Sequence, residues 1–189
     1  MRRWIAPYRI VLVALAGLPM AFAAAPAMAQ TEQESAALDA LFAQLSVARD
    51  EASARTITDQ IWIYWTTPAD PLLATQMQQV MRLRQQADFA GVLALLDEII
   101  AKNPDYAEAW NQRATIHYLL RNYQRSMADI AKVLEFEPRH FGALVGRAVM
   151  YENLGQHELA LADMVAALAI HPFLAERALF PELESLISI

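Results

Sequence analysis

Apolar residues recur at helical spacing along most of the chain, and prolines interrupt this pattern at regular intervals. Pro104, Pro138 and Pro172 lie 34 residues apart, and each follows an apolar stretch with the three- and four-residue steps of an amphipathic helix. Because proline prevents a helix from continuing, each marks the end of a unit. A fixed period of this length predicts a helical repeat, whose copies bury their apolar faces by stacking on one another.

The period predicts three copies of two antiparallel helices each, within residues 71–174. The copies are 73–106, 107–140 and 141–174. In the second copy Trp110, Ala114 and Tyr118 share one face of the first helix. Asn122 and Gly155 are predicted to supply the turns between the helices of the second and third copies, because they tolerate left-handed backbone geometry.

Residues 30–70 carry two further apolar stripes and predict a helical hairpin before the repeats. We expect this hairpin to cover the exposed end of the first copy, because terminal units of a stack need a polar outer face. It contains Trp62, Tyr64 and Trp65, an aromatic cluster that we interpret as core packing. A peptide-binding platform is the alternative for this cluster.

The last segment, 175–189, is expected to close the other end of the stack. A short helix over 174–179 is predicted to cap the third copy, and Pro181 opens one or two further turns. The apolar tail that follows, with Leu183 and Ile187, either packs back on the stack or serves as a docking peptide.

Residues 1–29 have the pattern of an export signal. Three arginines accompany the apolar run at 10–22, and Ala27 and Ala29 are small where signal peptidase requires it. We expect cleavage between Ala29 and Gln30 and a periplasmic mature protein. The alternative is an uncleaved anchor, because the apolar run and the residues after it are just long enough to span a bilayer.

Composition narrows the classes of partner. The chain has no cysteine, which excludes disulfides and thiolate metal sites. Without the three arginines of the signal, 12 basic and 21 acidic residues remain, a formal net charge of −9. Such an acidic chain disfavours nucleic acid as a partner, and membranes after cleavage of the signal.

The sequence resembles the tetratricopeptide repeat family. The matching positions are Val80, Phe89 and Pro104, then Trp110, Ala114, Tyr123, Ser126 and Pro138, then Ala148, Tyr151, Gly155, Ala160, Ala167 and Pro172. The sequence departs from the family pattern at Gln76 and Leu144, where an aromatic is usual, and at Ile99 and Val133, where alanine is commoner. The resemblance implies an all-α solenoid of antiparallel helix pairs that works as a protein-binding scaffold.

By the same resemblance, the concave groove is lined by side chains of the first helix in each copy. The expected groove residues are Met77, Met81, Arg84, Gln85, Asn111, Thr115, Tyr118, Leu119, Val145, Val149, Glu152 and Asn153. This lining is apolar with amides, and it lacks the paired lysine and asparagine with which clamps of this family hold a C-terminal carboxylate. A helix or an extended apolar segment of a protein or peptide therefore fits it better.

Two arginines occupy a position where the family usually has leucine. Arg113 and Arg147 are each followed sixteen residues later by an aspartate, Asp129 and Asp163. We interpret them as structural ion pairs inside each copy, whose fork geometry tolerates partial burial. A ladder of arginines for a ligand carboxylate is the alternative.

Catalytic motifs are absent from the sequence. Its four histidines lie at no metal-binding spacing, and we expect them at the surface or in helix turns. No nucleophile elbow, phosphate loop or dinucleotide fingerprint occurs. We therefore expect no enzyme, cofactor or metal, and predict an exported scaffold that binds a protein or peptide. A membrane-tethered assembly factor, a small-ligand module and self-association through the end helices remain as alternatives.

Overall fold

The computed structural model describes residues 25–183, with side chains from residue 35 onward. Within this part the chain forms eight α-helices and two short 3₁₀ helices, without a strand. They are α1 (Ala25–Ser46), α2 (Glu51–Thr66), α3 (Pro71–Gln85), α4 (Phe89–Lys102), α5 (Ala107–Leu119), α6 (Tyr123–Phe136), α7 (Phe141–Asn153), α8 (His157–Ile170), η1 (Ala175–Leu179) and η2 (Pro181–Leu183).

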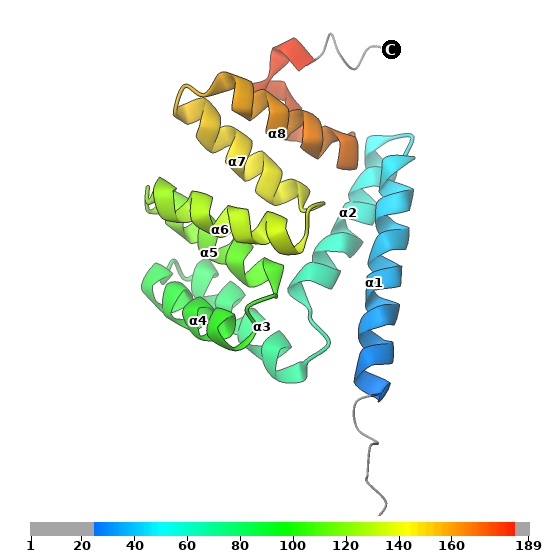
Figure 1. The fold of residues 1–189 in the computed structure, drawn as a ribbon, viewed down its shortest axis with the longest axis vertical. Coiled ribbons are helices and arrows are strands. Elements are labelled where there is room, and N and C mark those ends of the chain that lie inside the picture. The colour runs from blue at the N-terminus through cyan, green and yellow to red at the C-terminus, as the bar shows by residue number, and fades with distance from the viewer. Residues whose placement is uncertain (1–24, 184–189) are drawn as a thin grey trace, which may run out of the picture.

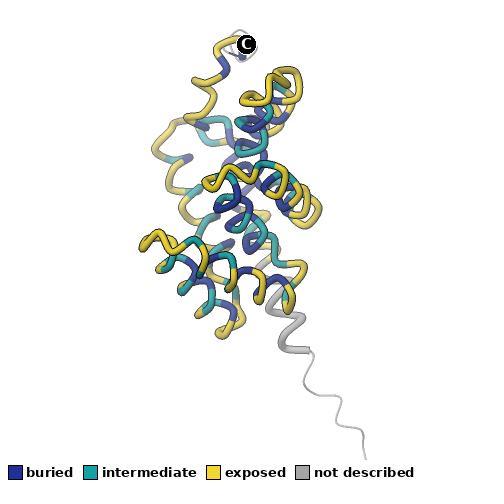
Figure 2. The backbone as a smooth tube through the Cα atoms, turned by 90° about the vertical axis from the view of Figure 1, so that its left-hand side faces the viewer, coloured by how far each residue is buried: buried dark blue, intermediate teal, exposed yellow. Residues whose placement is uncertain are grey.

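Helices α3 to α8 form three stacked pairs, which confirms the predicted all-α solenoid. The pairs follow one another along the long axis of the molecule, from α3 and α4 to α7 and α8 (Figure 1). Each pair packs on the next through its apolar faces. Buried and exposed stretches consequently alternate along each helix (Figure 2).

The turn inside each pair uses one left-handed residue. These residues are Ala87, Arg121 and Gly155, with φ of 56°, 59° and 70°. They repeat at the 34-residue period, so the three turns are equivalent. The prediction is right for Gly155 and wrong for Asn122, which has φ of −84° and precedes α6 as its N-cap residue. The packing of the two helices of each pair imposes the geometry of the turn between them. Arg121 adopts this geometry, although glycine would do so with less strain.

Helices α1 and α2 form the predicted hairpin, but its predicted position is wrong. The apolar stripes of the hairpin, including Phe42, Ile61 and Trp65, pack into one core with Phe141 and Val145 of α7. The core of the first pair contains no residue of α1 or α2. The hairpin therefore lies beside the stack and covers the third pair (Figure 1).

Helix α2 is held by residues at the two turns between pairs and at the turn that follows the third pair. The hydroxyl of Tyr106, before α5, donates to the carbonyl of Trp65 at 2.5 Å. The ring of His140, before α7, stacks on the Trp65 ring. Farther along, the Thr58 hydroxyl and His171 Nε2, after α8, are 2.9 Å apart. Helix α2 thus runs along the edge of the stack and ties the three pairs together.

The C-terminal segment closes the third pair with the predicted short helix, which is a 3₁₀ helix, η1. Phe180 and Leu183 are buried in the core of that pair, so this part of the segment packs back. The remaining tail residues, with Ile187, lie outside the described residues.

Residues 1–24 of the predicted export signal lie outside the described residues. Helix α1 begins at Ala25 and includes the predicted cleavage point, so a mature chain would start within this helix. Among the described helices, none combines the length and the apolar character that crossing a membrane requires.

Candidate functional site

The predicted groove is partly filled by the protein itself. Met77 is fully buried in the core of the first pair, and Val145 is covered by the hairpin. Asn111 is also buried, with its amide bonded to Glu108. Met77 and Val145 therefore cannot line an open groove, and Asn111 contributes very little surface to one, which corrects that part of the prediction. The nine others are half-buried or exposed: Met81, Arg84, Gln85, Thr115, Tyr118, Leu119, Val149, Glu152 and Asn153.

The open residues cluster toward the C-terminal ends of α3, α5 and α7. Leu119 at the end of α5 is 50% exposed, and Glu152 and Asn153 end α7 as exposed side chains. The beginnings of α5 and α7 are instead covered, because α2 packs there. The surface available to a partner is therefore shorter than the sequence predicts and is shifted toward one end of these helices.

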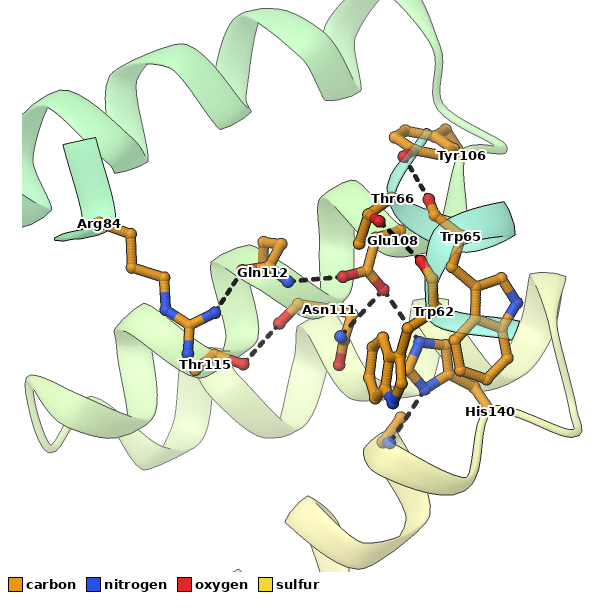
Figure 3. A network of polar contacts seen from close by, with 11 residues as sticks. Trp62, Trp65, Thr66, Arg84, Tyr106, Glu108, Asn111, Gln112, Thr115 and His140 are labelled. Atoms are coloured by element: carbon orange, nitrogen blue, oxygen red, sulfur yellow. Dashed lines mark hydrogen bonds and ion pairs between the residues drawn. The ribbon is translucent and has the colours of Figure 1, made fainter. Parts of the chain in front are cut away.

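A buried polar network lies beneath α2 (Figure 3). Glu108 is 1% exposed, and its carboxylate accepts from Asn111 Nδ2 at 3.0 Å and from Gln112 Nε2 at 2.5 Å. Gln112 in turn accepts from Arg84 Nη1 at 3.1 Å. These bonds connect α5 with α3. Burial of a carboxylate requires such partners, because desolvation without them is costly.

His140 is the third partner of Glu108, at 3.1 Å between Nε2 and Oε2, and it is fully buried. Its Nδ1 accepts from the backbone N–H of Ala143 and so caps α7. Because Nδ1 is an acceptor, the proton of the neutral ring lies on Nε2, which donates to Glu108. The Trp65 ring stacks on His140 at 4.0 Å between centroids, within 6° of parallel.

The sequence analysis did not predict the contact between Glu108 and His140, nor the burial of two other histidines. His117 and His171 are buried, and burial lowers the pKa of both. Only His157 is exposed; its hydrogen bond to Glu152 raises its pKa. The separation of 32 residues between Glu108 and His140 was an available signal, because residues about one repeat apart in a stack lie side by side.

Both predicted arginine–aspartate pairs are present as forked contacts. Arg113 Nε and Nη2 donate to Asp129 at 2.9 and 2.7 Å, and Arg147 donates to Asp163 at 2.6 and 2.7 Å. Arg113 also donates to Asp97 of the preceding pair at 2.7 Å, a contact between repeats that the prediction did not include. The hydrogen bonds to Asp129 raise the pKa of Arg113. These contacts favour the structural interpretation, since the guanidinium donors already have carboxylate partners.

The aromatic cluster of α2 serves packing. Trp65 is buried, and Trp62 makes edge contacts with His140 and Phe141 at 5.6 and 5.8 Å between centroids. Tyr64 alone is exposed. The cluster therefore has little exposed aromatic surface with which to form a peptide-binding platform.

A half-open hollow of about 180 Å³ lies between α5 and α7. Its lining residues are Asn111, Ala114, Thr115, Tyr118, Ser126, Ile130, Gly142, Ala143, Gly146 and Met150. Asn111, Thr115 and Tyr118 belong to the predicted groove, so the hollow adjoins the open surface. In the part of the chain that the structure describes, no three histidine, aspartate or glutamate side chains converge as a metal-binding group.

Comparison with known proteins agrees with this architecture. The family described as tetratricopeptide repeat matches residues 107–140, which are the second predicted copy. A TPR repeat-containing protein of Rhizobium etli is 41% identical over 135 residues, which cover 71% of this chain and 66% of that relative. Tetratricopeptide repeats generally mediate protein–protein interaction, and proteins built from them are typically non-enzymatic scaffolds. With its three stacked pairs and these matches, the chain belongs to the tetratricopeptide repeat family.

Proposed function

We propose that this protein is an exported adaptor without chemistry of its own, which binds a segment of another protein across the open ends of α3, α5 and α7. The observation that carries this proposal is the position of the open groove residues. Leu119 and Val149 contribute apolar surface there, and Arg84, Gln85 and Asn153 contribute polar groups. Such a mixed surface suits a segment that presents both side chains and backbone.

The main alternative for a buried Glu–His pair is catalysis, and its surroundings argue against this role. His140 has no exposed surface, and both of its ring nitrogens have partners in the protein. Nor does the network contain a nucleophile placed beside the imidazole. The pair therefore supports the fold, and the open surface remains the place for function.

A matched pair of leucine substitutions tests the binding surface. Leu119 on α5 and Leu159 on α8 are 50% and 49% exposed, so a charge at either position disturbs folding to a similar, small extent. We expect Leu119→Glu to weaken binding of a partner captured from the cell envelope by about tenfold or more, about 1.4 kcal/mol. Leu159→Glu is expected to leave it unchanged. The measurement is titration calorimetry with the purified partner; equal affinity of both variants would refute the surface.

Export has its own test, because it depends only on the N-terminal residues. N-terminal sequencing of the protein from the periplasmic fraction of a Gram-negative host is expected to begin at Gln30. Replacing Ala29 with phenylalanine should block processing, since signal peptidase needs a small residue there. A chain that retains Met1 and sediments with membranes in its unaltered form would instead support the tethered assembly factor.

A further inference from the structure

Helix α7 contains one glycine at its start, Gly142, and one in its interior, Gly146, and the two have different surroundings. At Gly142 an added Cβ would lie 3.1 Å from Cη2 of Trp62, so the close approach of α2 favours glycine there. At Gly146 the nearest atom to an added Cβ is Ile130 Cδ1 at 3.8 Å, an ordinary van der Waals distance. Glycine weakens a helix interior relative to alanine. No neighbour among the described residues explains its presence at position 146.

What Gly146 provides is space. With no side chain there, the hollow of about 180 Å³ between α5 and α7 stays open on one side. Ala114, Ile130 and Met150 make its apolar wall, and no aspartate, glutamate, lysine or arginine lines it. An apolar cavity of about 150 Å³ in another protein holds a benzene molecule. The hollow is thus of a size for one leucine, methionine or phenylalanine side chain.

The rim of the hollow carries polar groups that can contact a backbone. Thr115 donates its hydroxyl to the carbonyl of Asn111, which leaves the hydroxyl oxygen able to accept. The Tyr118 hydroxyl has no hydrogen-bond partner among the described residues and is free to donate or accept. An apolar wall with such a rim is typical of a pocket that anchors one side chain of a bound segment.

We propose that this hollow is the specificity pocket of the binding surface, and that it receives a single leucine, methionine or phenylalanine side chain of the bound protein segment. The inference rests on the proposed function, since the segment is the one that lies across α5 and α7. It adds the chemistry by which partners are chosen: an uncharged apolar anchor beside Gly146 is required, and a charged residue at the same place is rejected.

Two substitutions at one position test the pocket. Gly146→Ala adds one methyl group in contact with Ile130 and leaves most of the hollow open, whereas Gly146→Leu fills it. A library of random twelve-residue peptides is selected on the purified unaltered protein. We expect the selected peptides to share one leucine, methionine or phenylalanine, and replacing that residue with alanine to weaken binding at least tenfold.

Affinities for one selected peptide then separate the outcomes. Gly146→Ala is expected to bind as the unaltered protein does, and Gly146→Leu at least tenfold more weakly. In Gly146→Leu the alanine-substituted peptide should lose nothing further. Unchanged affinity of Gly146→Leu, with weakened binding to Leu119→Glu, would overturn this inference and leave the proposed function standing. If no peptide binds the unaltered protein, both fail.

A spectroscopic readout covers the case in which Gly146→Leu does not fold. Met150 lies in the wall of the hollow, and the NMR signal of its methyl group is expected to report on an occupant. In the unaltered protein the selected peptide should shift this signal, and the peptide with alanine at the anchor should not. Equal shifts with both peptides, or none with either, would overturn the assignment of the pocket.

Discussion

Replacing Trp65 with alanine is expected to destabilise the protein by about 3–5 kcal/mol, the usual cost of removing a large buried aromatic side chain. Trp65 is 7% exposed and contacts Phe42, Trp62, His140 and Phe141. Its loss leaves a cavity between the hairpin and α7. Because the hairpin covers the third pair, the weakened region should be α7 and α8, although Trp65 is close to α3 in sequence.

Hydrogen exchange of backbone amides locates the effect, and Trp110→Ala is its control. Trp110 packs in the cores of the first and second pairs and donates its indole N–H to the carbonyl of Pro104 at 2.9 Å. Its removal should lower the protection of α3 to α6. We expect Trp65→Ala to lower the protection of α7 and α8, with α3 and α4 unchanged. Loss of protection first in α3 and α4 would mean that the hairpin covers the first pair.

His140→Ala is expected to cost a similar amount, about 3–5 kcal/mol, for an electrostatic reason. The substitution takes one of three hydrogen-bond donors from the buried Glu108 carboxylate and removes the cap of α7. It also removes the ring that stacks on Trp65. Chemical denaturation followed by circular dichroism measures the change in the free energy of unfolding.

Two further variants separate the charge from the packing. Glu108→Gln in the His140→Ala background makes the buried side chain neutral, so the double variant should be less destabilised than the two single effects added together. His157→Ala removes an exposed histidine that is also bonded to glutamates, and should leave the free energy of unfolding nearly unchanged. If His140→Ala and His157→Ala were equally mild, Glu108 would not depend on His140.

Both predictions concern the packing of the hairpin of α1 and α2 against the stack. The hairpin, through Trp65 and its neighbours, covers the beginnings of α5 and α7 and leaves their ends open. The groove expected from the sequence is thus partly occupied by the chain's own helix. The remaining surface is short, and the hollow beside Gly146 lies in it. A short surface with one pocket favours recognition of a brief segment with a single anchor residue.

Local patterns predicted the features that repeat at short range. The spacing of Pro104, Pro138 and Pro172 predicted the pairs, because a proline ends a helix wherever it occurs. The pairing of Arg113 with Asp129 was also predictable, since residues sixteen apart face each other across one helical hairpin. Both inferences need only the geometry of a single pair, which the chain builds from neighbouring residues.

Taken by itself, the sequence determined the helices, their pairing and the solenoid, because proline positions and helical periodicity act over one or two turns of chain. The tertiary structure decided where the hairpin lies, that Glu108 and His140 meet beneath it, and that Gly146 borders a hollow. An amphipathic stripe tells which face of a helix is buried but not against what, since apolar surfaces attract without direction. The residues that fill or spare the groove therefore depend on contacts between segments far apart in the chain.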